Sequence, residues 1–141
     1  MKLFKKYVTR PTRRTPAVLL EAGRIIITGR SISENPREFY RPVYEWIREY
    51  VNADHTMTSV EFGFEYINTS STKWIYNIIK LLSGVEDISE RVKVIWYHER
   101  GDDDMNELGL ILMSLVECPF DIVEVAEMKK IAGDPVFLKT L

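Results

Sequence analysis

The chain has a single cysteine and no long apolar run. These two features limit the classes of protein to which it can belong. Its 141 residues include one cysteine, Cys118, so no intrachain disulfide can form, and a reducing, cytoplasmic setting is expected. No run of about 18 apolar residues is present, so no membrane-spanning helix is predicted. The basic start lacks the apolar core of a secretory signal. A hydrophobic content of 45% in a chain of this length predicts one globular domain.

The charge is small overall but unevenly distributed. A net charge of −2 argues against nucleic acid as the main partner. Six of the nineteen basic residues lie in residues 1–14, and the rest of the chain holds all twenty-one acidic residues. We therefore treat residues 1–14 as a basic N-terminal arm. Such an arm is either a solvated or strand-like extension, or a segment that contacts an acidic partner or another anionic ligand.

Hydrophobic periodicity predicts alternating strands and helices after an opening hairpin. Asn35 is a good N-cap residue, with Pro36 at the first helical position and Glu38 three residues after the cap. Pro42 lies inside this helical pattern, where it predicts a kink or a delayed helix. The expected elements are strands 16–21 and 24–29, a helix from 36 to about 51, strand 58–67, a helix ending at 83–84, strand 91–98, a helix over 105–115 and strand 120–125.

This order predicts an α/β fold with a mixed, mostly parallel sheet and three to four helices, the fourth being a possible short helix in the tail 126–141. Val60, Phe62, Phe64 and Tyr66 alternate with small or charged residues. The alternation predicts that these four side chains point to one buried face. It favours a two-layer sandwich over a sheet covered on both faces.

The stretch EYINTSSTKWI places five consecutive polar residues, 68–72, where a strand is expected to become a helix. The simplest interpretation is an N-cap formed by Asn68 or Ser70 with the other hydroxyl groups in solvent. A second interpretation is a phosphorylation site, because free N–H groups and the positive helix end favour an added phosphate. The residues alone leave both interpretations open.

An acidic turn, Asp102-Asp103-Asp104, precedes the third long helix. It most simply complements the helix dipole, although carboxylates also bind Mg²⁺. A hydrolase would use Ser70 or Ser71 with His98 and Asp103, but no G-x-S-x-G motif is present. Because carboxyl ends of parallel strands share one sheet edge, we expect the acidic turn near the hydroxyl turn. Together they would form one recognition surface with Ser31, Glu34 and Asn35.

Three blocks, GRSISENPREFY, EYINTSSTKWI and WYHERGDDDMNELG, resemble those of the SiaC family of bacterial regulatory phosphoproteins. The resemblance covers about residues 15–125 and departs from the family pattern at Ile32-Ser33, where Tyr-Pro is usual. It implies a STAS-like domain at 15–126, with the tail 127–141 outside it. It also implies no enzymatic activity, no cofactor and no bound metal.

The same resemblance implies a switch in partner binding. A cognate Ser/Thr kinase would phosphorylate Thr69, with Ser70 and Ser71 as second choices, and a PP2C-like phosphatase would remove the phosphate. The unmodified form would bind and activate a diguanylate cyclase that controls cyclic-di-GMP and biofilm formation. The expected partner-binding residues are Ser31, Glu34, Asn35, Asn68, Ser70, Asp103 and Asp104.

Overall fold

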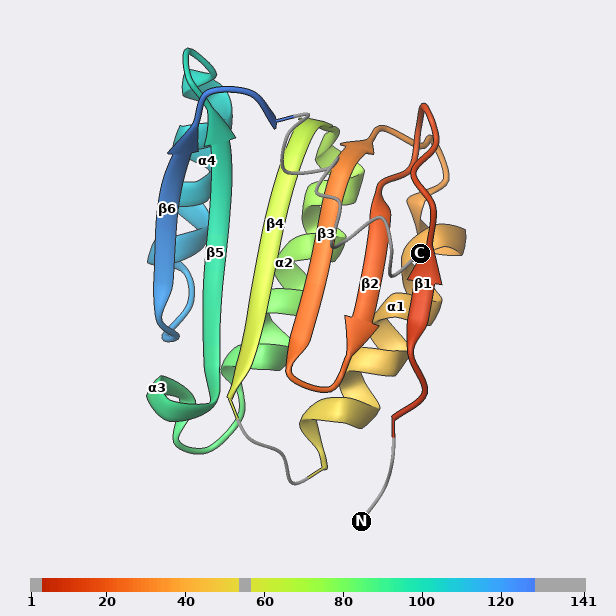
Figure 1. Ribbon diagram of the computed structural model, residues 1–141, viewed down its shortest axis with the longest axis vertical. Coiled ribbons are helices and arrows are strands. Elements are labelled where there is room, and N and C mark those ends of the chain that lie inside the picture. Colours follow the sequence, from red (N-terminus) through yellow and green to blue (C-terminus); the bar gives the residue numbers. More distant parts are fainter. Residues whose placement is uncertain (1–3, 54–56, 129–141) are drawn as a thin grey trace.

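The computed structural model describes residues 4–53 and 57–128, and these form one layer of strands backed by one layer of helices (Figure 1). The elements are β1 (Tyr7–Thr9), β2 (Ala17–Glu21), β3 (Arg24–Ser31), α1 (Pro36–Val51), β4 (Thr58–Ile67), α2 (Thr69–Ser83), α3 (Ile88–Arg91), β5 (Val92–Glu99), α4 (Asp103–Ser114) and β6 (Phe120–Val125). The predicted α/β class and mixed sheet are confirmed. The short helix considered for 126–141 falls mostly outside the described residues.

The strand order in the sheet, β1-β2-β3-β4-β5-β6, is the order of the sequence. The pairs β1–β2 and β2–β3 are antiparallel, and the pairs from β3 to β6 are parallel. Each parallel connection is a crossover in the same direction across the sheet. Because such crossovers are right-handed, every connecting helix falls on the same face.

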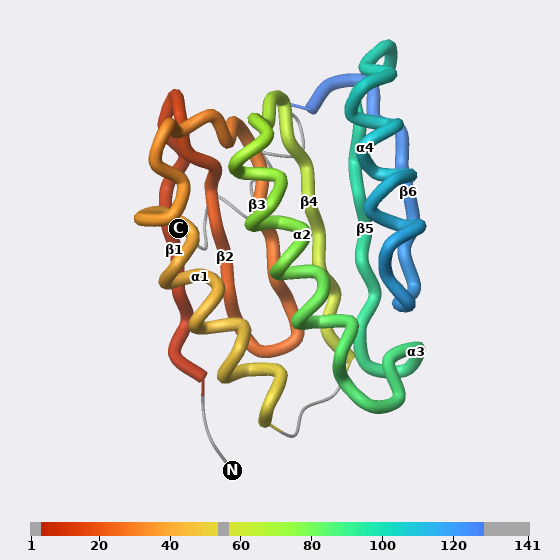
Figure 2. Tube along the Cα trace, turned by 180° about the vertical axis from the view of Figure 1, so that it is seen from behind, coloured from red at the N-terminus to blue at the C-terminus, as the bar shows by residue number. Residues whose placement is uncertain are grey.

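Figure 2 shows the result from the helix side, with α1, α2 and α4 lying side by side over the sheet. Their apolar stripes meet the inward residues of the strands in one core, which includes Ile47, Ile75 and Leu112. Trp96 is fully buried there, and its ring centroid lies 5.7 Å from that of Phe62. The indole N–H donates to the Met105 carbonyl at 3.0 Å, so Trp96 fixes the first turn of α4 on β5. The predicted two-layer arrangement is therefore confirmed.

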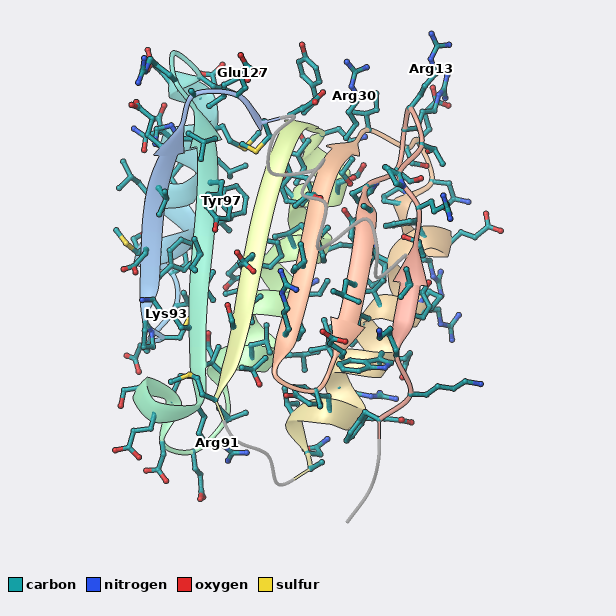
Figure 3. All side chains as sticks on the ribbon, viewed as in Figure 1. Arg13, Arg30, Arg91, Lys93, Tyr97 and Glu127 are labelled. Carbon is teal, nitrogen blue, oxygen red and sulfur yellow. The ribbon has the colours of Figure 1, made fainter. Side chains whose placement is uncertain are left out.

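The helix-free face of β3 to β6 is polar and carries cross-strand ion pairs. Arg24 lies 3.9 Å from Glu61, and Lys93 lies 3.1 Å from Asp121. The Tyr97 hydroxyl donates to Glu61 at 2.8 Å, which connects β5 to β4. Figure 3 labels Lys93 and Tyr97 along β5 on this face. A small apolar cluster of Ala17, Leu19 and Ile26, with Val8 against it, lies towards β1.

Three local features refine the predictions. Residues 7–9 pair with β2, which agrees with the strand-like alternative for this part of the basic arm. The helix α1 begins after Asn35, as predicted, but the Asn35 side chain makes no capping hydrogen bond. Instead, the Asn35 N–H donates to the Ser33 hydroxyl at 3.1 Å. Helix α1 continues through Pro42, which lies on its exposed side.

Candidate functional site

The carboxyl ends of β3, β4 and β5 meet at one edge of the sheet, at the top of Figure 1. Three polar segments follow these strands: residues 32–35, Asn68, and residues 100–102. The Asn68 N–H donates to the Ser31 carbonyl at 2.9 Å, which joins the end of β4 to the end of β3. The prediction that the hydroxyl turn and the acidic turn share one sheet edge is confirmed.

Asn68 organises the start of α2. Its side-chain oxygen accepts a hydrogen bond from the Ser71 N–H at 2.9 Å, which satisfies one of the free donors of the first turn. Its side-chain nitrogen donates to the Ser33 carbonyl at 3.0 Å. One amide therefore caps α2 and holds the loop that leads into α1. The predicted capping role of Asn68 is confirmed.

The three candidate hydroxyl groups have different environments. Thr69 is exposed, and its hydroxyl makes no hydrogen bond to any residue in the described part of the chain. Ser70 is exposed and its hydroxyl donates to the Asn68 side-chain oxygen at 3.3 Å. Ser71 is 0% exposed. Because Ser71 is buried, a kinase cannot reach its hydroxyl group in the folded protein. Ser71 is therefore not a second choice for phosphorylation, contrary to the expectation. Thr69 is accessible.

The electrostatics of this helix start also favour an anion. Thr69 is the first residue of α2, and the first turn contains no acidic residue. The partial positive charge of the helix N-terminus is therefore not balanced by a side chain of that turn. A phosphate on an exposed residue here would lie near free N–H groups and the positive end of the helix dipole. Adding it would therefore not be expected to unfold this part of the domain.

Ser31 lies at the end of β3, and its side chain is buried beneath this edge of the sheet. It is 2% exposed, and its hydroxyl forms a 2.5 Å hydrogen bond with the Tyr40 hydroxyl. Burial raises the pKa of Tyr40, and the Ser31 hydrogen bond partly offsets this. This position differs from the expectation that Ser31 contributes to the recognition surface. Glu34 and Asn35 are exposed on the same loop.

The acidic turn forms the other half of the edge. Asp102 caps α4 by accepting the Met105 N–H at 3.1 Å, and Asp103 and Asp104 are exposed. A hollow of about 290 Å³ separates this turn from the end of β4. Its lining consists of Glu65, Tyr66, Ile67, Asp102, Asp104, Met105 and Leu108. The structure thus places Asp104, but not Asp103, in the hollow beside the end of β4.

Tyr66 is the residue at this edge that the sequence pattern places wrongly. It is 58% exposed, although alternation along β4 predicts a buried position. The register explains the difference: Gly29 pairs with Phe64 but Arg30 pairs with Tyr66, so β4 contains an extra residue, a β-bulge. Gly29 has φ +118, a conformation that L side chains rarely adopt. This glycine in a strand pattern is the signal that could have predicted the bulge.

The positions of the candidate metal-ligating and catalytic side chains can be compared with the enzymatic alternatives. The described residues contain no group of three His, Cys, Asp or Glu side chains that could hold a metal ion. Ser71 is buried, and no hydrogen bond joins Ser70 or Ser71 to His98 or Asp103 among the described residues. No described helix has the length and apolar character needed to cross a bilayer.

The fold and this edge define a small α/β domain that presents an accessible threonine at a strand-to-helix turn, beside an acidic turn. The chain belongs to the SiaC family of regulatory phosphoproteins, whose family model matches residues 9–125. The match starts within β1, so it includes the end of the basic arm.

One relative and two solved structures from Pseudomonas aeruginosa are similar to this chain. An uncharacterized protein of strain UCBPP-PA14 is 27% identical over 113 residues, covering 79% of this chain and 90% of the relative. The crystal structure of apo-SiaC is 26% identical, with a TM-score of 0.76 over 84% of this chain and 98% of that one. The structure of the diguanylate cyclase SiaD in complex with its activator SiaC matches with a TM-score of 0.78 and 26% identity over 84% of this chain and 99% of that one.

Proposed function

We propose that this chain is a non-enzymatic regulatory phosphoprotein, and that reversible phosphorylation of Thr69 switches its binding to a partner protein. The observation that carries the proposal is the environment of Thr69, which is exposed, free of hydrogen bonds within the described residues, and first in a helix whose opening turn has no acid. A cognate Ser/Thr kinase adds the phosphate and a PP2C-like phosphatase removes it.

The proposed effector is a diguanylate cyclase, by analogy with the P. aeruginosa complex in which SiaC is the activator of SiaD. The partner contacts the edge formed by Glu34, Asn35, Asn68 and Ser70 together with the acidic turn at Asp103 and Asp104. A dianion on Thr69 disrupts this contact, because a charged group that becomes enclosed in an interface loses its hydration. The unmodified protein is then the form that binds.

The phosphorylation site is tested by mass spectrometry on protein isolated from its source cells. We expect one added phosphate, mapped to Thr69 in the peptide that contains residues 65–73. The Thr69→Ala variant should lose the modification, and the matched Ser70→Ala variant, altered one residue away at another exposed hydroxyl, should keep it. A phosphate that persists in Thr69→Ala would overturn the assignment.

The effector is tested with purified SiaD of P. aeruginosa as the probe. We expect the unmodified chain and Thr69→Ala to raise cyclic-di-GMP synthesis, and Thr69→Asp to raise it less or not at all. Absence of any stimulation by the unmodified chain would contradict the cyclase assignment. Equal stimulation by Thr69→Ala and Thr69→Asp would contradict the switch.

A further inference from the structure

We propose that Tyr66 anchors the partner interface, and that an arginine of the partner stacks on its ring and pairs with Asp104 in the adjacent hollow. This inference rests on the proposed partner binding but not on the direction of the phosphorylation effect. Tyr66 lies three residues before Thr69, so a partner that grips Tyr66 also lies against the hydroxyl turn.

Tyr66 is not part of the hydrophobic core formed by the described residues. Among the described residues it is the most exposed of the large apolar side chains, while Phe62 and Phe64 on the same strand are buried. A β-bulge and a positive-φ glycine turn it outward. Bulges often re-aim a side chain beside a functional site, and exposed tyrosines are frequent anchors of protein interfaces.

The ring of Tyr66 is already held by a cation from this chain. The Arg30 guanidinium lies 5.1 Å from the ring centroid, and its Nε is 3.2 Å from Glu65. Figure 3 labels Arg30 at the same end of β3. A ring fixed in this way loses little side-chain freedom on binding, which favours its use as an anchor.

Two hollows border Tyr66, and they differ in charge. The hollow of about 560 Å³ contains acids and bases together, because Arg30 and Arg100 line it with Glu65, Glu99 and Asp102. The hollow of about 290 Å³ next to α4 is lined by three acids and no base. Of these acids, Glu65 is paired with Arg30 and Asp102 caps α4. The Asp104 carboxylate makes no ion pair or hydrogen bond within the described residues, so it is the carboxylate available to a partner.

The chemistry of this second hollow fits an arginine better than any other side chain. Met105 and Leu108 supply apolar surface for the aliphatic stem. The planar guanidinium can stack on Tyr66 and donate two hydrogen bonds to the Asp104 carboxylate. A lysine would keep the charge but lacks the planar group, and a neutral side chain would leave the carboxylate unpaired.

The first test uses N-acetyl-arginine amide as the probe and follows amide shifts by nuclear magnetic resonance. We expect saturable shifts in residues 65–67 and 102–108, with weaker shifts for the lysine analogue and none for the norleucine analogue. Tyr66→Phe should retain binding, and Tyr66→Ala should weaken it about tenfold. The matched pair is Asp104→Asn, which should weaken binding, and Asp103→Asn on the same turn, which should not. Equal shifts with norleucine, or with Asp104→Asn, would overturn the arginine site.

The second test measures activation of SiaD of P. aeruginosa by the same variants of Tyr66 and Asp104. Tyr66→Ala and Asp104→Asn should raise the concentration of chain needed for half-activation about tenfold. Tyr66→Phe should stay near the parent chain, and so should the charge control Glu107→Gln, which removes an exposed acid of α4 outside the hollow. Failure of the unmodified chain to activate SiaD would refute the cyclase assignment. The arginine site would then be tested by the titration with N-acetyl-arginine amide alone. Activation that is insensitive to Tyr66→Ala would refute this inference alone.

Discussion

The two turns that follow β4 and β5 are built alike but charged differently. Each begins a helix with a side-chain oxygen that accepts the N–H three residues later, at 2.9 Å for Asn68 and 3.1 Å for Asp102. The first turn of α2 has no acid, whereas that of α4 has Asp103 and Asp104. One turn exposes a hydroxyl group where the other exposes carboxylates.

The difference shows how a fold can separate a permanent charge from a reversible one. The positive end of α4 is balanced by the acidic side chains of its own first turn. The positive end of α2 is left unbalanced, so a phosphate added at Thr69 completes an arrangement that its neighbour already has. Such a site can change charge without a change in fold, and the predictions that follow alter one turn while the other serves as reference.

The largest expected effect comes from Gly109→Ala. This change disturbs the packing of α4, which carries the acidic turn, against β5 and does not alter the hydroxyl turn. A Cβ at Gly109 would lie 2.5 Å from Cδ1 of the buried Trp96. Overpacking of this kind costs roughly 2–3 kcal/mol of unfolding free energy, which urea denaturation measures. The matched control, Gly84→Ala, places a Cβ no closer than 3.6 Å to any atom and should change stability little. Equal stability of the two variants would contradict the close packing of α4 against Trp96.

The two capping residues should differ when each is replaced by alanine. Asn68→Ala removes the cap and the 3.0 Å bond to the Ser33 carbonyl, so we expect a loss of about 2 kcal/mol. Asp102→Ala removes one capping bond and should cost about 1 kcal/mol. Thermal unfolding of both variants measures the difference. If Asp102→Ala were the more damaging change, the bridging role of Asn68 would be wrong.

Charge exchange between the turns should produce a smaller, opposite pair of effects. Thr69→Asp adds an acid to an unbalanced helix start and should stabilise the protein by about 0.3–1 kcal/mol. Asp103→Asn removes one and should destabilise it by a similar amount. Both effects should shrink in high salt, because exposed charges are screened. A Thr69→Asp variant that is clearly less stable than the parent would mean that this turn does not tolerate an anion.

The smallest effect concerns the bond between the strands that carry the two turns. Burial, followed by the hydrogen bond and charge of Glu61, raises the pKa of Tyr97 to about 12. The folded state then holds this proton more tightly than the unfolded state, whose tyrosine has a pKa near 10. Stability from this group is therefore full below about pH 10 and is lost as the pH rises towards 12. Tyr97→Phe should flatten that decline in a pH series of urea melts; an unchanged slope would argue against the shift.

Most of the fold could be predicted from the sequence, because long periodic segments determine it. Five strands and three long helices were expected from the spacing of apolar residues. Strand β1 was not assigned, because three residues within a basic segment gain their strand character only from pairing with β2. Helix α3 was also missed, since four residues with no buried side chain leave no periodic signal.

The site was predictable where local chemistry decides it and unpredictable where register does. The Asn68 cap and the exposed Thr69 follow from residue type at a helix start. The burial of Ser71 was also readable, because it lies four residues before Ile75 on the buried stripe of α2. The outward position of Tyr66 depends on the register between β4 and β3. The alternation of residues within one strand gives no information on that register.

The agreement between sheet order and sequence order has a consequence for synthesis of the protein on the ribosome. Each strand that emerges finds its neighbour already in place, and no later segment has to be inserted between strands that have paired. We therefore expect the sheet to grow from the β1 side in step with translation. The acidic turn and β6 would then join last.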